Sequence, residues 1–173
     1  MKKIILYAAL VAPLFLAACG GSTDTADQTA GTDSVSSTLP EVSTAPAAGV
    51  SNTIEITADD AMKFNTTEIR VKAGEQVTLT LKNIGSMPKE SMGHNWLLLG
   101  SGTDLEAFAM QAMVSKDSDY IPGDLKAGIV ANTKLLGPGE SDTITFTVPA
   151  GTYEFICSFP GHYASMRGKL IAE

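Results

Sequence analysis

One stretch near the C-terminus, residues 151–168, constrains this chain more than any other. It carries a thiol, an imidazole and a thioether in order: four residues separate Cys157 from His162, and three separate His162 from Met166. Alternating apolar residues before the cysteine predict a strand that ends there. Phe159-Pro160-Gly161 predicts a turn, because proline fixes one backbone torsion and glycine frees the next. Such a turn would bring His162 and Met166 back towards the sulfur.

A thiolate, imidazole nitrogens and a distant thioether are the ligands of a blue copper electron-transfer site. Such a site needs a second histidine, and the only other one in the chain is His94, within Met92-Gly93-His94-Asn95-Trp96. Taken singly, each side chain has an ordinary reading, since buried cysteines and methionines are common core residues. Together, both histidines and the only cysteine beyond Cys19 have spacings that suit one metal ion, so the sequence predicts a single copper ion, Cu(II)/Cu(I).

The N-terminus predicts export and a lipid anchor. Residues 1–18 combine a charged start with an apolar core, which is typical of a secretion signal. The segment ends in Leu16-Ala17-Ala18-Cys19, which looks like the cleavage box of a bacterial lipoprotein. Cleavage there would leave Cys19 as the first residue, carrying several acyl chains that anchor it stably in a membrane. The alternative is an ordinary cleaved signal in which Cys19 is incidental.

Residues 19–50 are mostly Ser, Thr, Ala, Gly, Asp and Pro. Such a segment buries too little apolar surface to offset the entropy of ordering it, so we expect a disordered tether between the lipidated Cys19 and the domain. The chain has a formal net charge of −7 and no Lys/Arg cluster, which argues against nucleic-acid binding. With Cys19 acylated, Cys157 would have no disulfide partner, and metal ligation would protect its thiol.

Residues 51–173 read as one all-β domain. Short alternating runs separated by Gly- and Pro-containing turns predict an antiparallel β-sandwich. One helical segment interrupts the strands: Thr103-Asp104-Leu105-Glu106 fits a capping box, which predicts a short helical flap. The predicted strands cover residues 54–56, 69–71, 77–81, 94–99, 144–148, 153–157 and 169–172.

Several motifs of this domain together resemble the azurin and auracyanin type of cupredoxin, a family of blue copper proteins. They are Met87-Pro88-Lys89, residues 92–96, Ala131-Asn-Thr-Lys-Leu135, and residues 157–162 followed by Met166. The resemblance covers essentially all of residues 51–173 and implies a Greek-key β-sandwich. It also implies the ligand roles: His94, Cys157 and His162 in a trigonal plane, Met166 as a long axial ligand, and the Gly93 carbonyl opposite.

The resemblance further implies that Asn95 joins the two ligand segments and that Asn95 and the Phe159 N–H donate hydrogen bonds towards the sulfur. An apolar docking patch is expected around His162, made of Met62, Met87, Met92, Phe159 and Pro160. This chain differs from azurin in two respects. The azurin disulfide is absent, and Asn83 stands where azurin has a pH-sensitive histidine.

The expected function is one-electron transfer between redox proteins, such as cytochromes or membrane oxidase and reductase complexes. We expect a lipid-anchored monomer in the cell envelope, facing the periplasm or the exterior. A copper oxidase or nitrite reductase fragment would need further histidines for a second, open metal centre, and the chain has none left. The alternatives are copper delivery by the same ligands and a metal-free adhesive sandwich.

Overall fold

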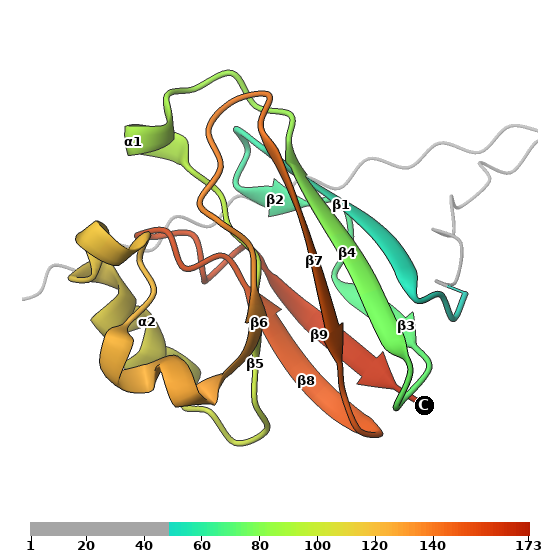
Figure 1. Cartoon of the computed structure of the whole chain (residues 1–173). Coiled ribbons are helices and arrows are strands. Elements are labelled where there is room, and N and C mark those ends of the chain that lie inside the picture. The colour runs from blue at the N-terminus through green and yellow to red at the C-terminus, as the bar shows by residue number, and fades with distance from the viewer. Residues whose placement is uncertain (1–48) are drawn as a thin grey trace, which may run out of the picture. The chain divides into compact units, whose positions relative to one another are not determined.

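The computed structural model describes residues 49–173; the expected signal peptide and nearly all of the expected tether lie outside the described residues. Strands of this part form two facing sheets, with helical segments gathered on one side (Figure 1). The sheet orders are β2-β1-β4-β7 and β3-β9-β8-β5-β6. The strands are β1 (Thr53–Asp59), β2 (Lys63–Phe64), β3 (Glu68–Val71), β4 (Gln76–Asn83), β5 (Leu97–Leu99), β6 (Ile129–Asn132), β7 (Ser141–Thr147), β8 (Gly151–Ile156) and β9 (Arg167–Ala172). The predicted all-β sandwich is confirmed.

Alternation of buried and exposed residues decides which face of each strand meets the core. In β4 the side chains of Val77, Leu79 and Leu81 are fully buried, and the residues between them are half-buried or exposed. At the centre of the core lies Trp96, fully buried, with its ring centroid 5.8 Å from that of Phe146 and 5.6 Å from that of Phe155. These three residues come from both sheets, so aromatic packing joins the layers.

The expectation of a purely antiparallel sandwich is wrong for two strand pairs. β1 runs parallel to β4, and β3 runs parallel to β9. The chain leaves the first sheet after β2, crosses to the second sheet as β3 and returns as β4. This crossover brings β4 back in the direction of β1. Periodicity identifies the strands but carries no information on their mutual direction.

The helical part is more extensive than the sequence predicts. It comprises α1 (Lys89–Met92), α2 (Leu105–Met113) and the 3₁₀ turns η1 (Lys116–Ser118) and η2 (Gly123–Gly128). The predicted capping box does not form: Asp104, not Thr103, is the N-cap, and its carboxylate accepts a hydrogen bond from the Ala107 N–H, but Ala107 has no side-chain acceptor to return one. Thr103 instead donates its hydroxyl to the Gly100 carbonyl. No helix within residues 49–173 has the length and apolar character needed to cross a lipid bilayer.

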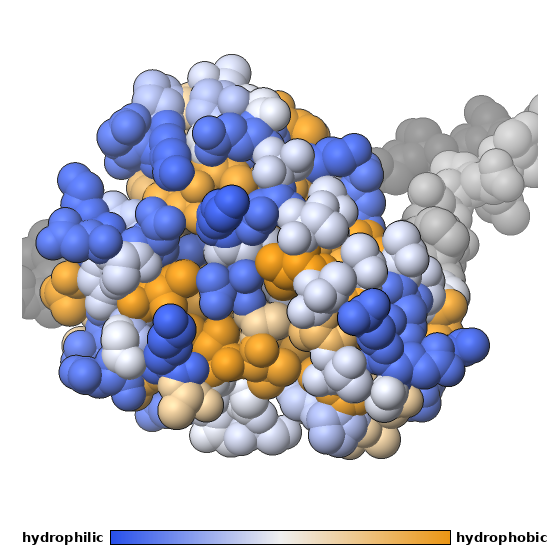
Figure 2. All heavy atoms as spheres, in the orientation of Figure 1, coloured by the Kyte–Doolittle hydropathy of each residue, from blue (hydrophilic) through white to orange (hydrophobic). Residues whose placement is uncertain are grey.

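One end of the sandwich brings together segments from both sheets. The start of β5 pairs with the end of β8 through Leu97 and Ile156, so the residues just before and just after these strands lie together. On the other sheet, the end of β1 pairs with the end of β4 through Ala58 and Asn83. On the face shown in Figure 2, apolar residues form separate patches among polar side chains.

Candidate metal centre

Three buried side chains converge at this end of the sandwich. His94 precedes β5, Cys157 follows β8, and His162 lies in the loop between β8 and β9. Their potential ligand atoms all lie within 4.8 Å of one another. The Cys157 Sγ is 3.6 Å from the His162 Nδ1, and the two imidazole centroids are 5.0 Å apart. The structure therefore brings together the three residues that the sequence predicts as in-plane ligands.

Backbone hydrogen bonds fold the loop that carries Cys157, His162 and Met166 back on itself. The Cys157 N–H donates to the Met166 carbonyl at 2.9 Å, and the Met166 N–H donates to the His162 carbonyl at 2.8 Å. Gly161 adopts φ +82°, the left-handed conformation that glycine supplies at a turn. Met166 is fully buried, and its backbone lies directly beside that of Cys157.

Gly93 stands immediately before His94, where helix α1 ends. A Cβ at this position would lie 2.7 Å from the Lys89 carbonyl oxygen and 3.1 Å from the Leu135 side chain. Only glycine fits there without displacing backbone. The His94 N–H and carbonyl pair with Leu136 at 3.1 and 2.8 Å, which fixes the histidine backbone against the neighbouring strand segment.

Asn95 joins the two ligand segments. Its Oδ1 accepts a hydrogen bond from the Ser158 N–H at 2.8 Å, and its Nδ2 donates to the Ser158 Oγ at 2.8 Å and to the Asp119 carbonyl at 3.1 Å. The side chain is fully buried. Because Asn95 follows one ligand and Ser158 follows another, these bonds hold His94 and Cys157 at a fixed separation.

Electrostatics keep the three side chains neutral in the absence of a metal. Burial raises the pKa of the Cys157 thiol to about 11, and the backbone N–H groups of Asn95 and Phe159, which face the sulfur, partly oppose that shift. Burial, and secondarily the nearby charge of His94, lowers the pKa of His162 to about 4. Burial also lowers the pKa of His94, against a smaller opposing effect of the Asp59 carbonyl.

The donor set fits a copper ion. Both ring nitrogens of His94 are buried without a hydrogen-bond partner, although buried polar atoms are nearly always satisfied. The Asp59 carbonyl faces the ring but does not reach hydrogen-bond geometry. A metal ion would satisfy His94. One soft thiolate and two imidazoles suit copper, which also binds such sites more tightly than other divalent metals.

The expected docking residues differ in exposure. Met62 is 38% exposed and Met87 is 40% exposed, whereas Phe159 is only 7% exposed and packs its ring 4.7 Å from that of His162. Met92 and Pro160 are half-buried. His162 itself is 2% exposed, so only a small part of its imidazole reaches the surface.

Three residues of this end escape the sequence analysis. Ser158 is the partner of Asn95, Ile84 is 63% exposed after β4, and Asp60 accepts hydrogen bonds from the loop that carries Met87. Ser158 lies inside the ligand motif, so its position in the sequence could have identified it as part of the site. Asp60 stands in a turn and Ile84 in a loop, neither with a recognisable pattern, and only the fold brings them to this end.

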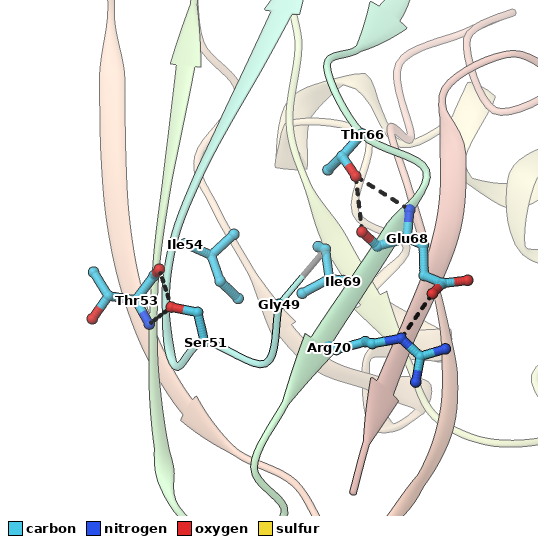
Figure 3. Close-up of a pocket in the computed structure, with 8 residues that line it drawn as sticks. All are labelled: Gly49, Ser51, Thr53, Ile54, Thr66, Glu68, Ile69 and Arg70. Carbon is cyan, nitrogen blue, oxygen red and sulfur yellow. Dashed lines mark hydrogen bonds and ion pairs between the residues drawn. The ribbon is translucent and has the colours of Figure 1, made fainter. Parts of the chain in front are cut away.

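A surface cleft away from this centre has a water-accessible volume of about 160 Å³ and lies between β1 and β3 (Figure 3). Its polar groups bond one another: Ser51 with Thr53, Thr66 with the Glu68 backbone, and Arg70 with the Glu68 carboxylate. It contains none of the three converging ligands. The cleft therefore does not compete with the metal centre as the functional site.

Comparison with known proteins agrees with the geometry. Residues 50–173 match the family model described as copper binding proteins, plastocyanin/azurin family. Azurin from Pseudomonas chlororaphis is 42% identical over 125 residues, which cover 68% of this chain and 95% of that protein. Outer membrane protein H.8 from Neisseria gonorrhoeae is 42% identical over 120 residues, which cover 66% of this chain and 64% of that protein.

Among solved structures, dithionite-reduced auracyanin from the photosynthetic bacterium Roseiflexus castenholzii matches with a TM-score of 0.65 and 37% identity, covering 72% of this chain and 99% of that one. The expected resemblance to azurin and auracyanin is confirmed, and with it the cupredoxin fold and the copper cofactor. The chain belongs to the plastocyanin/azurin family of copper-binding proteins.

Proposed function

We propose that this protein carries single electrons between redox partners outside the cytoplasmic membrane. A lipid on Cys19 anchors it to a membrane of the cell envelope. The core of the proposal is established: the chain is a blue copper electron-transfer protein and not an enzyme. The observation that carries it is the convergence of His94, Cys157 and His162 within 4.8 Å in a buried site. The tether, the axial ligands and the docking surface are the proposed parts.

When bound, copper supplies a one-electron couple, and the protein's task is to keep the ligands in place while the charge changes. The segments that carry His94, Cys157 and His162 are held by backbone pairing or by the hydrogen bonds of Asn95. The N–H groups of Asn95 and Phe159 stabilise negative charge on the Cys157 sulfur. A rigid, buried scaffold limits rearrangement between the oxidised and reduced states, which favours fast transfer.

Met166 and the Gly93 carbonyl would be the further, weaker ligands that help to hold the copper ion. Support for Met166 comes from its full burial and from its backbone contact with Cys157. Gly93 is supported by its place beside His94 and by the lack of room for a side chain. Replacing Met166 with leucine, which is similar in volume, should keep the visible copper–thiolate band but change the reduction potential. An unchanged potential would remove Met166 from the coordination sphere.

Spectroelectrochemical titration of the copper-loaded full chain tests the proposed function directly. We expect an intense visible band from cysteine-to-copper charge transfer that bleaches and returns in one reversible one-electron step. Absence of the band, or irreversible reduction, would refute the carrier role.

We propose that redox partners dock transiently at the apolar surface around His162, formed by Met62, Met87, Met92, Phe159 and Pro160. Redox encounters use small, short-lived interfaces, for which a limited apolar surface is sufficient. The expected partners are cytochromes or membrane oxidase and reductase complexes, met by a monomeric carrier.

Met87→Glu tests the docking surface, because this exposed side chain can be changed without disturbing the core. Like charges facing each other across an encounter are costly, so electron self-exchange should slow by roughly tenfold or more while the visible band stays unchanged. Met110→Glu, on the exposed face of α2, is the matched control and should leave the rate near that of the parent protein. Equal rates in all three proteins would exclude Met87 from docking.

An envelope location is supported by the relatives, among them the Neisseria protein named outer membrane protein H.8. The lipid on Cys19 is the proposed refinement, and Gly20 favours the outer membrane where the cell has one. Cys19→Ala should move the protein from the membrane fraction to the aqueous fraction. Cys157→Ser should abolish the copper band but keep the protein in the membrane fraction. Membrane retention of Cys19→Ala would contradict the lipid anchor.

A further inference from the structure

A carboxylate outside the copper ligands organises part of the surface beside them. Asp60 lies in the turn between β1 and β2, and its Oδ2 accepts hydrogen bonds from both the N–H and the hydroxyl of Ser86 at 2.8 Å. Its Oδ1 accepts a third, longer bond from the Met87 N–H at 3.3 Å. These bonds, led by that from the Ser86 backbone, lower the pKa of Asp60, so the group is ionised at neutral pH. One side chain thus receives three donors from residues 26 and 27 positions further along the chain.

The loop after β4 is shaped to fit around this carboxylate. Asn83, which is buried, accepts a hydrogen bond from the Gly85 N–H at 2.9 Å and donates to the Leu136 carbonyl at 3.2 Å. A Cβ at Gly85 would collide with the Asp60 carboxylate. Ile84 donates its N–H to the Ala58 carbonyl at 2.9 Å, which ties the same loop to β1. The loop can therefore approach the Asp60 carboxylate closely, because residue 85 is glycine and has no side chain in the way.

Three exposed apolar side chains lie on the two segments that Asp60 joins. Met62, with φ +54°, stands two residues after Asp60, and Ile84 and Met87 stand on the partner loop. They are 38%, 63% and 40% exposed. Within the described residues, the Asp60 carboxylate is the group that accepts the Met87 N–H. The contact therefore holds the segment that carries Met87 against the segment that carries Met62.

Asp60 also lies close to a copper ligand: its carboxylate and the Asn83 side chain meet at Gly85, and the Leu136 carbonyl that Asn83 bonds also accepts the His94 N–H. Its negative charge opposes the burial that lowers the pKa of His94, and the reciprocal effect of His94 helps to lower the pKa of Asp60. The other acidic neighbour with such an effect on His94 is Asp59. A fixed negative charge near the site favours the more positive, oxidised state of the centre.

We propose that Asp60 is a positioning residue for electron transfer: its carboxylate fixes Met87 beside Met62 at the docking surface, and its charge lowers the reduction potential. This inference rests on the proposed function. The merely structural alternative is that Asp60 stabilises a loop with no effect on redox behaviour. The two differ in the reduction potential and in the exchange rate, so both quantities belong in the test.

Three variants of the copper-loaded full chain separate charge from geometry. Asp60→Asn keeps an oxygen acceptor but removes the charge, whereas Asp60→Ala removes both. Glu75→Gln is the matched control, because it removes one negative charge from the turn before β4, at the opposite end of that strand from Asn83. The measurements are the visible band, the reduction potential, amide hydrogen exchange at Ser86 and Met87, and electron self-exchange. Self-exchange is measured in 1 M salt, where the Debye length of about 3 Å suppresses general charge repulsion.

We expect the potential to rise in both Asp60 variants and not in Glu75→Gln. Amide protection at Ser86 and Met87 should fall about tenfold in Asp60→Ala, as expected when a hydrogen bond to a charged group is lost. Self-exchange should fall by a similar factor in that variant alone. Potentials and rates that match the control would overturn the role of Asp60 while leaving the carrier function intact. Loss of the visible band in the parent protein would instead overturn the proposed function itself.

Discussion

Replacing Asn95 with alanine should destabilise the metal-free protein by about 3–5 kcal/mol. The substitution leaves the buried Ser158 N–H and the Asp119 carbonyl without their partners, and it removes the bond to the Ser158 hydroxyl. The buried Ser158 N–H that loses its partner costs about 1–3 kcal/mol, and the half-buried Asp119 carbonyl and the lost bond to the Ser158 hydroxyl add about 1 kcal/mol each. This loss is a large fraction of the roughly 5–15 kcal/mol by which domains of this size are stable.

Urea unfolding of the metal-free protein at neutral pH, followed by circular dichroism, measures the loss without a contribution from copper binding. Asn132→Ala is the control: this half-buried side chain donates a single hydrogen bond, to the Thr133 carbonyl at 3.1 Å, and its removal should cost about 1 kcal/mol. The copper-loaded Asn95→Ala protein should also show a shifted visible band. If Asn95→Ala lowers the free energy of unfolding no more than Asn132→Ala does, Asn95 does not stabilise the contact between the ligand segments.

Three further outcomes follow from the structure. First, the metal-free protein should be most stable between about pH 7 and 9. The pKa of His162 falls from its usual 6.5 to about 4, so the unfolded chain binds more protons and about 3 kcal/mol is lost as the pH drops through this range. The pKa of Cys157 rises from 9 to about 11, so stability that is present below pH 9 is lost as the pH climbs to 11; a flat profile in urea titrations would contradict both shifts. Second, the reduction potential should change little between pH 5 and 8, because the chain's two histidines are both ligands and Asn83 does not titrate; a steep slope in voltammetry would argue against this. Third, Gly168→Ala should destabilise the protein by about 1–3 kcal/mol, because its Cβ would collide with an aromatic ring and a backbone carbonyl. Gly123→Ala, with open space around it, should not, and equal thermal midpoints would refute the collision.

The strands with regular alternation could be predicted because alternation is a local property. β4 buries every second residue, and its bounds differ from the expectation by one or two residues. β2 and β6 were missed, because β2 has only two residues and β6 has no fully buried side chain. The parallel pairing of β1 with β4 could not be predicted from periodicity, since it depends on a crossover between sheets.

The three side chains that converge at the metal centre could be predicted because thiol and imidazole groups are rare in this chain and their spacing is distinctive. Asp60 illustrates the limit. Its neighbours in sequence give no hint of a role, and its partners Ser86 and Met87 are placed only when β1 and β4 lie side by side. Asp119 is similar, because its carbonyl meets Asn95 only through an irregular segment.

The parallel pairing of β1 and β4 gives the domain a polarity along its long axis. β1 starts at Thr53, beside Thr78, and reaches Ala58, beside Asn83 near the copper site, about 17 Å further on at roughly 3.3 Å per residue. Residues 49–52, which precede β1, therefore enter the domain at the end opposite the copper site. In the anchored form that we propose, attachment at that end would leave the copper site facing away from the lipid surface. Membrane complexes and diffusing carriers could then both approach it.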